Sequence, residues 1–242
     1  MNTIHIDNNS NLTNITIKED TNIFYNNAKK NITIEILKDC KVFEYIKDSN
    51  IETNYKINSS LYINRFVVNS SIKTIIDLNK EEIELNYYYS NINILDNKYE
   101  ITINHNKKRT ISNVINHGIN ISNNKLSYIV NGKVSKDSSG VICNQDSKII
   151  LTNDNNCLIK PNLIIDNDDV IANHSSYIGY FKKDEIFYLM TRGINELDSE
   201  KLLVKSFLIG NMDISYEERK IILENINSHW RWYKWIVMIS KY

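Results

Sequence analysis

Four polar residues in the last third of the chain have types and spacing that could do chemistry. Asp166, Asp168 and Asp169 lie close together, and His174 follows a few positions later. Paired carboxylates act as acid and base in glycoside hydrolysis, and a neutral imidazole is a suitable iron ligand. Asp side chains also build solvated turns, because they bond nearby backbone N–H groups. The residues alone leave two readings open, a polysaccharide-acting carboxylate site and an acidic turn followed by a surface histidine, and they favour the turn.

Other catalytic patterns do not occur in the sequence. It contains no GxSxG nucleophile motif, no HExxH zinc motif and no glycine-rich phosphate loop. Its five histidines are scattered, without the spacing of metal ligands on one helix face: His5, His105, His117, His174 and His229. The three cysteines, Cys40, Cys143 and Cys157, form no CxxC pair, which is typical of a reducing compartment. We expect each cysteine to be a small buried residue.

Composition limits the partners and the location of the protein. A chain of 242 residues forms one or two domains at about 150 residues per domain. Its formal net charge is zero, so it has no basic field that would attract nucleic acid or an anionic membrane. Residues 1–17 do not resemble a signal peptide, and no apolar run approaches the roughly 20 residues of a membrane helix. We therefore expect a cytoplasmic protein that binds neither nucleic acid nor membrane.

The first three quarters of the chain alternate with a period of two residues. Typical runs are Ile32–Ile36, Val42–Ile46 and Tyr99–Ile103, which are rich in β-branched and aromatic residues. Segments rich in Asn, Asp and Ser separate these runs and predict turns, because such residues tolerate positive φ. One proline and six glycines are few for the tight turns of a sandwich. The pattern predicts a β-solenoid over residues 1–180 with coils of about 20 residues, the low end of solenoid repeats, and a sandwich stays open as the alternative.

After Gly179 the pattern changes to helical spacing, which predicts a C-terminal helical domain over residues 181–242. The start and stop signals are Asp184 and Gly193 for a first helix, Asn195 and Gly210 for a second, and the capping box Ser215–Glu218 for a third. Ile221, Ile222 and Ile226 would then lie on one face of the third helix. Trp230, Trp232 and Trp235 follow, and they are interpreted either as packing on the body or as an anchor for a partner.

A series of short motifs in the second half of the chain has a common order and spacing. The β part contributes Thr110–Ser112, Gly132–Val134, Ile149–Thr152, Lys160–Ile164, Asp168–Val170, His174 and Gly179. The helical part contributes Phe187–Leu189, Arg192–Ile194, Leu202, Leu203 and Phe207. In this order the motifs resemble the C-terminal half of the SufB/SufD family, the scaffold proteins of iron–sulfur cluster assembly.

The chain also departs from the family pattern. Arg109 stands where the family usually has a histidine before the Thr-x-Ser strand, and Ala172 stands where a cysteine is common. In SufB a cysteine at the position of Ala172 is thought to hold the nascent cluster, so the chain resembles SufD more than SufB. Ser175 and Ser176 replace smaller residues. The sequence begins directly in a strand pattern, so we expect a SufD-like form truncated at the N-terminus.

The resemblance implies a fold, a function and a set of sites. It implies a mainly β protein, a right-handed parallel β-helix followed by a small helical domain, with no enzymatic activity of its own. The implied function is that of a scaffold which pairs with a SufB-like protein or with itself and binds a SufC-like ATPase. His174 would offer a transient ligand to iron or a cluster at the partner interface, with no stably bound cofactor. The residues implied to bind the ATPase partner are Phe187, Tyr188, Arg192, Gly193, Leu202, Leu203 and Phe207. A purely structural or binding solenoid is the remaining alternative.

Overall fold

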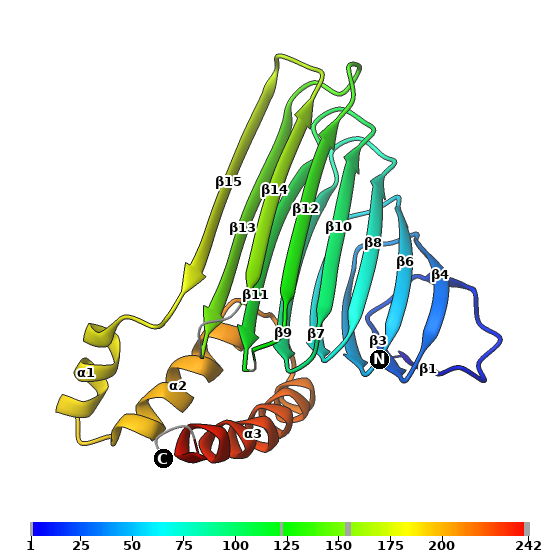
Figure 1. Ribbon diagram of the computed structural model, residues 1–242. Coiled ribbons are helices and arrows are strands. Elements are labelled where there is room, and N and C mark those ends of the chain that lie inside the picture. The colour runs from blue at the N-terminus through cyan, green and yellow to red at the C-terminus, as the bar shows by residue number, and fades with distance from the viewer. Residues whose placement is uncertain (1, 122, 153–155, 240–242) are drawn as a thin grey trace.

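A computed structural model describes residues 2–121, 123–152 and 156–239, with side chains as far as His229 (Figure 1). Two parallel sheets face each other, and consecutive strands alternate between them. Sheet A holds β1 (Asn2–Ile6), β3 (Thr21–Asn26), β5 (Cys40–Lys47), β7 (Leu61–Val68), β9 (Glu84–Asn93), β11 (Ile111–Asn120), β13 (Val141–Leu151) and β15 (Val170–Gly179). Sheet B holds β2 (Asn14–Ile17), β4 (Lys29–Ile36), β6 (Asn50–Ile57), β8 (Ser71–Leu78), β10 (Asn97–His105), β12 (Leu126–Val134) and β14 (Cys157–Ile165). The described strands therefore form a flattened parallel β-helix, as predicted, and not a sandwich of antiparallel strands.

Each coil adds one strand to each sheet, and the coils lengthen along the chain. Asn2 pairs with Thr21, a repeat of 19 residues. In the last coils Ile111 pairs with Ile142, a repeat of 31 residues. Figure 1 shows the strands growing taller from the blue to the yellow end. The prediction of about 20 residues per coil fits the first coils only, because later coils have longer strands.

Asparagine and aspartate build the corners of the early coils, as the sequence indicated. Asn27, Asp48 and Asn69 have φ angles of 50°, 48° and 48° and occupy the same place in successive coils. Their short polar side chains tolerate this left-handed conformation better than most residues do. Asn69 also donates a hydrogen bond through Nδ2 to Oδ1 of Asp48 at 3.0 Å. These corners explain how the chain turns sharply with so few glycines.

The interior of the β-helix is filled by inward side chains from both sheets. Buried residues along it include Ile23, Ile34, Ile63, Tyr87, Ile101 and Tyr128. Because neighbouring strands pair in register, identical positions of successive coils stack on one another. This stacking fixes which face each strand residue occupies, which matters for the site at the end of the β-helix.

Three helices follow the strands: α1 (Lys183–Thr191), α2 (Glu196–Ile209) and α3 (Tyr216–Ile239). The first begins one residue before Asp184, because Lys182 is its N-cap and the Glu185 carboxylate accepts the Lys182 N–H at 3.1 Å. The predicted N-cap of α2 is confirmed, since Asn195 Oδ1 accepts the N–H of Asp198 at 2.9 Å. The predicted capping box of α3 is confirmed by reciprocal bonds between Ser215 and Glu218.

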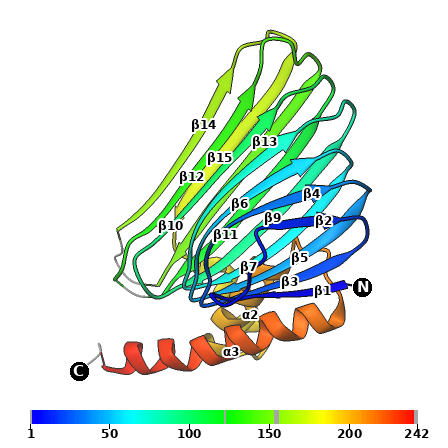
Figure 2. The same cartoon turned by 90° about the vertical axis from the view of Figure 1, so that its right-hand side faces the viewer.

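Helices α2 and α3 lie against the outer face of sheet A and share a core with it (Figure 2). On α2 and α3 this core contains Val204, Leu208, Ile209, Ile222 and Ile226, and on the sheet it contains Phe43, Phe66, Ile92, Ile119 and Ile150. Ile222 and Ile226 are buried as predicted, whereas Ile221 is half-buried. The side chains of Trp230, Trp232 and Trp235 lie outside the described residues. The division into domains at residue 180 stays a prediction.

Candidate functional site

The β-helix ends at an open edge formed by its last strands, β14 and β15. Within the described strands β15 pairs only with β13, and β14 pairs only with β12. Several large apolar side chains on these two strands are exposed, with Ile171 at 61% and Ile164 at 47% of their full accessibility. Edge strands with exposed apolar residues are templates for pairing with another chain. The open edge is therefore the part of the β-helix best suited to bind a partner.

His174 lies in the middle of β15 at this open edge. Val170 and Ala172 of the same strand pack against the interior cluster of the last coils. Since side chains alternate along a strand, His174 faces the same inward side. No coil covers it within the described residues, so its imidazole is exposed. His174 is thus an exposed imidazole placed at the mouth of the β-helix interior.

Gln145 lies directly beneath His174. The two residues are register partners on β13 and β15, so their side chains occupy the same column. Gln145 is only 4% exposed. Neither its Nε2 nor its Oε1 has a hydrogen-bond partner among the described residues. Buried polar groups are nearly always paired, so an unpaired amide here marks an unfinished environment.

The cysteine nearest this column is Cys143, the register partner of Ala172. Its side chain is buried, and burial raises the pKa of the thiol, although the Ser112 hydroxyl partly opposes this shift. Cys40 is also buried, which raises its thiol pKa to about 11. Cys157 is half-buried and accepts a hydrogen bond from Asn120. The expectation of buried, inert thiols is confirmed for Cys40 and Cys143, and Cys157 is more open than expected.

The donor set of this chain does not form a complete metal site on its own. The described residues contain no cluster of three or more His, Cys, Asp and Glu side chains suited to hold a metal ion. His174 offers one imidazole, and the nearest thiol is buried and protonated at neutral pH. Iron or a cluster bound by His174 would therefore need further ligands from another chain.

The acidic residues before His174 form the exposed turn between β14 and β15. Asp166, Asp168 and Asp169 are all exposed. The turn closes on Asn167, whose Oδ1 accepts the N–H of Asp169 at 2.8 Å, and the Asp169 carbonyl accepts the N–H of Gly140. These contacts are those of a turn held by an Asn side chain. The structure thus favours the acidic-turn interpretation over a carboxylate site.

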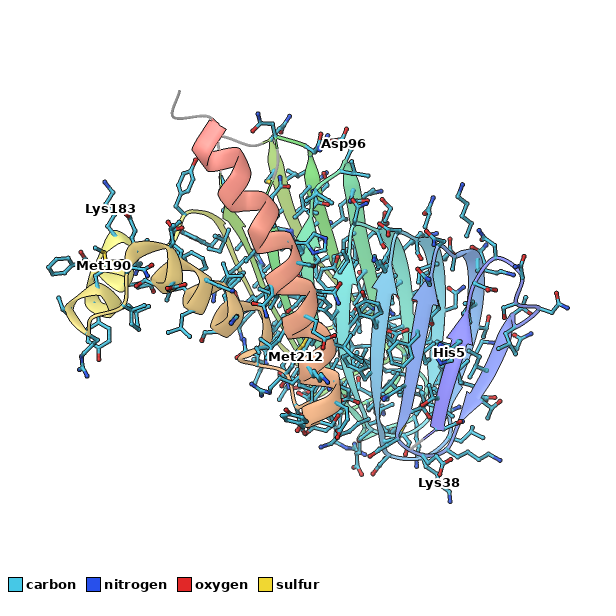
Figure 3. The ribbon with its side chains drawn as sticks, turned by 90° about the horizontal axis from the view of Figure 1, so that it is seen from below. His5, Lys38, Asp96, Lys183, Met190 and Met212 are labelled. Atoms are coloured by element: carbon cyan, nitrogen blue, oxygen red, sulfur yellow. The ribbon has the colours of Figure 1, made fainter. Side chains whose placement is uncertain are left out.

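Helix α1 presents an aromatic surface away from the body. Phe187 is 65% exposed and Tyr188 is 57% exposed, and no residue of α1 is buried. Arg192 packs over the Tyr188 ring with its guanidinium carbon 5.0 Å from the ring centroid and donates to the Tyr188 hydroxyl at 2.9 Å. Gly193, with φ of 84°, ends the helix in the left-handed conformation predicted for it. Figure 3 shows α1, marked by Lys183 and Met190, projecting from the side opposite the coils that carry His5 and Lys38.

The other predicted partner-binding residues lie on α2 and differ in exposure. Leu202 is exposed, whereas Leu203 is half-buried. Phe207 is half-buried and stacks on His117 of β11, with ring centroids 4.2 Å apart. His117 Nδ1 donates to the Phe207 carbonyl at 2.7 Å, and its buried Nε2 has no hydrogen-bond partner in the part of the chain that the structure describes. Phe207 therefore attaches α2 to sheet A, and Leu202 is the member of this group that faces solvent.

A buried charge network inside the middle coils was not predicted from the sequence. The Glu44–Arg65 ion pair is fully buried, and Arg65 Nε donates to Glu44 Oε2 at 2.6 Å. Arg65 also donates to Thr74 at 2.6 Å and Thr53 at 3.3 Å, and the Tyr25 hydroxyl donates to Glu44 at 3.0 Å. Burial is the main reason that the pKa of Tyr25 is raised, and the adjacent Glu44 carboxylate adds to it. This network satisfies both charges without solvent.

A second buried polar group, His105, also escaped the sequence interpretation. Its Nδ1 lies 2.8 Å from the Thr110 hydroxyl, which itself donates to the Lys107 carbonyl, so Nδ1 carries the proton. Its Nε2 accepts from Ser112 at 2.9 Å. Burial lowers the pKa of His105 to about 4. The sequence signal for this group was a histidine at an inward position of a strand. Its neutral state depends on burial and on the contacts with Thr110 and Ser112, which the alternation of the strand does not reveal.

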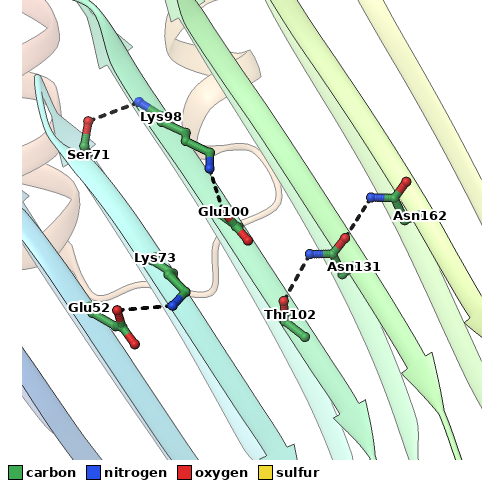
Figure 4. Close-up of polar contacts among 8 residues, drawn as sticks. All are labelled: Glu52, Ser71, Lys73, Lys98, Glu100, Thr102, Asn131 and Asn162. Carbon is green, nitrogen blue, oxygen red and sulfur yellow. Dashed lines mark hydrogen bonds and ion pairs between the residues drawn. The ribbon is translucent and has the colours of Figure 1, made fainter.

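The outer face of sheet B carries two ion pairs between neighbouring lysine and glutamate side chains (Figure 4). Lys73 lies 3.3 Å from Glu52, and Lys98 lies 2.7 Å from Glu100, in a shallow groove across the early coils. Lys29 and Lys30 also line this groove. Paired surface charges of this kind contribute little stability.

Together these features define a class of protein: a parallel β-helix with an open C-terminal edge and a helical module packed on one sheet. Comparison with known families places it further. Residues 1–207 match the family model described as "SUF system FeS cluster assembly, SufBD core domain". The chain belongs to this family.

Individual relatives agree with the family match over shorter segments. A 78-residue segment, 32% of the chain, is 32% identical to the iron–sulfur cluster assembly protein SufD of Bacillus subtilis, of which it covers 18%. A 60-residue segment, 24% of the chain, is 40% identical to a SufBD family protein of Mycobacterium leprae, of which it covers 15%. A 48-residue segment, 20% of the chain, is 40% identical to SufD of Escherichia coli, of which it covers 11%. The matched segments thus span less than a fifth of each relative. Among the described helices none has the length and apolar character needed to cross a membrane.

Proposed function

We propose that this chain is a non-catalytic scaffold component of SUF iron–sulfur cluster assembly in the cytoplasm. In this role it pairs with a SufB-like protein through the open edge of β14 and β15, and the nascent cluster is its cargo. The observation that carries the proposal is the position of His174, an exposed imidazole at the unpaired end of the β-helix. Membership of the SufBD family supports the same role.

The chemistry of the site favours a scaffold over an enzyme. Among the described residues, no thiols or carboxylates join His174 in a group that could bind a metal ion. The aspartates of the acidic turn are exposed to solvent. A single neutral imidazole can coordinate iron but cannot hold it alone. The chain would therefore contribute one ligand to a cluster whose remaining ligands come from the partner.

The helical module provides the second docking surface, for a SufC-like ATPase. Phe187 and Tyr188 on α1 and Leu202 on α2 are exposed apolar side chains, and α1 packs against α2. Aromatic residues and arginine are favoured at the centres of interfaces, and Arg192 lies on the Tyr188 ring. Because Phe207 is occupied in holding α2 to sheet A, the docking surface is the outer side of α1 and α2.

The proposed ATPase surface is tested by surface substitutions and not by truncation. Removing residues 181–242 would uncover the apolar face of sheet A that packs on α2 and α3. Phe187→Ala should instead weaken ATPase binding by about 2 kcal/mol or more, as for a central interface aromatic, with an unchanged thermal melt. Tyr216→Ala is the matched control, because Tyr216 is an aromatic residue on α3 with 77% exposure. Equal ATPase recovery by both variants in co-purification would exclude α1 as the docking surface.

A further inference from the structure

Four asparagines form a hydrogen-bonded ladder on the outer face of sheet A. Asn86, Asn113, Asn144 and Asn173 are register partners on β9, β11, β13 and β15. Asn173 Nδ2 donates to Asn144 Oδ1 at 3.1 Å, and Asn144 Nδ2 donates to Asn113 Oδ1 at 3.0 Å. Asn113 Nδ2 donates to Asn86 Oδ1 at 3.1 Å. Asn113 and Asn144 thus each donate toward the preceding coil and accept from the following one.

The direction of this ladder is set by a carboxylate at its inner end. Asn86 Nδ2 donates to Glu84 Oε1 at 2.8 Å. An ionised carboxylate can only accept, so Asn86 must turn its Nδ2 toward Glu84 and its Oδ1 toward Asn113. The same orientation then passes from one amide to the next. The ladder ends on β15 with the Asn173 Oδ1 directed at the open edge, where no further strand among the described residues supplies a donor.

Sheet B carries a second ladder with the same direction, which Figure 4 shows. Asn162 Nδ2 donates to Asn131 Oδ1 at 2.7 Å, and Asn131 Nδ2 donates to Thr102 Oγ1 at 3.1 Å. These residues are register partners on β14, β12 and β10. The terminal Oδ1, on Asn162 of the edge strand β14, again points away from β12 and toward the open edge. Two independent ladders therefore present a carbonyl oxygen at the same end of the molecule.

The remaining outward polar side chains of β15 use their hydrogens within the chain. The Ser175 hydroxyl donates to Asp146 on the preceding strand, and the Tyr177 hydroxyl donates to the Tyr180 carbonyl at 2.9 Å. In a planar amide the N–H opposite the carbonyl serves the ladder, and the other N–H points sideways. The outward side of β15 thus directs the Asn173 carbonyl oxygen toward the open edge, while the second N–H of Asn173 takes no part in the ladder.

We propose that the open edge selects a partner strand whose outward side chains are hydrogen-bond donors, and that Asn173 and Asn162 determine this specificity. The inference rests on the proposed function and names the chemistry of the SufB-like partner's edge. Backbone pairing at a sheet edge gives affinity without selectivity, whereas side chains in register give selectivity. If two copies paired through β15 with Asn173 opposite Asn173, two carbonyl oxygens would meet, which is unfavourable when both are desolvated.

The experiment compares binding of a SufB-like protein from the same genome by four purified forms of the full chain. Asn173→Leu and Asn162→Leu remove the terminal acceptors, and each should weaken binding about tenfold or more, as expected when a buried donor loses its acceptor. Asn54→Leu is the matched control, because Asn54 is an outward residue of β6, away from the open edge. It should bind like the unmodified chain. Thermal melts establish that all four forms are folded, and sedimentation measures self-association of the unmodified chain.

The outcomes separate this inference from the proposed function. Weakened binding by both edge variants, with a monomeric unmodified chain, supports the inference. Unchanged binding by both edge variants overturns the inference, while the scaffold role stands. Self-association of the unmodified chain through the open edge, as tight as its binding to the partner, also overturns the inference. If the unmodified chain does not bind the SufB-like protein at all, the proposed pairing and this inference both fail.

Discussion

The buried charges of the middle coils and the buried amide at the open end of the β-helix differ in their partners. Around Glu44 and Arg65 each charge has hydrogen-bonded partners within the chain. At the open end Gln145 is buried without a hydrogen-bond partner among the described residues, and His174 above it is exposed. A satisfied network stabilises the chain alone, whereas an unsatisfied column is suited to contacts from outside. This difference supports the proposed pairing at the last coil.

The largest expected effect comes from breaking the satisfied network. Arg65→Met leaves the Glu44 carboxylate buried without its cation, which should cost about 3–5 kcal/mol of unfolding free energy. Chemical denaturation of the isolated chain measures this change. The paired replacement Glu44→Leu with Arg65→Met is the control, because removing both charges together is often nearly neutral. Equal destabilisation by the single and paired forms would show that the ion pair is not what makes Arg65 necessary.

The second effect is acid destabilisation through His105. Its pKa is lowered from 6.5 to about 4 by burial, so the unfolded chain binds the proton more readily than the folded chain. The contribution of neutral His105 to the unfolding free energy is present above pH 6.5. It is lost as the pH falls toward 4, by up to about 3 kcal/mol. Unfolding curves across this range, compared with those of His105→Gln, isolate the contribution. The same acid slope in both proteins would assign the loss to other groups, with His117 the first to examine because its pKa is also lowered by burial.

The comparison also shows what the sequence could and could not predict. Alternation predicted the strands, and cap residues predicted the helices, because both signals are local. Alternation did not predict which side of a strand is inward. In Val42–Ile46 the structure buries Phe43 under the helices and directs Glu44 into the interior. Both faces of sheet A are covered at this strand, so apolar residues occur on both sides of it. Alternation therefore does not distinguish the inward side from the side under the helices.

The candidate site was located by motif order and not by periodicity. The family motifs indicated His174, but no sequence pattern indicated that Gln145 lies beneath it. That pairing joins residues 29 positions apart, and the spacing depends on the length of one particular coil. The asparagine ladders were hidden for the same reason, since an Asn-rich chain offers many candidates and only the register selects those that stack.

The unsatisfied amide makes a prediction of opposite sign to that for Arg65. Gln145→Leu removes a buried group without a partner, so the isolated chain should gain about 1 kcal/mol of stability. Thermal and chemical unfolding measure it. Asn144→Leu is the control on the neighbouring residue, and it should destabilise the chain because Asn144 makes two ladder bonds. A loss of stability in Gln145→Leu as large as that in Asn144→Leu would mean that Gln145 is already satisfied in the free chain.

The smallest expected change in stability, and the most direct test of the open end, concerns His174. Because its imidazole is exposed, His174→Ala should alter the unfolding free energy by no more than about 0.5 kcal/mol. Iron and sulfide bound by the reconstituted complex should nevertheless fall, because the imidazole supplies one of the proposed ligands. His5→Ala is the matched control, since His5 is an exposed histidine on β1 at the other end of the β-helix. An unchanged cluster content in His174→Ala with a normal melt would reduce His174 to a surface histidine, and unfolding of the variant would instead make it a packing residue of the last coil.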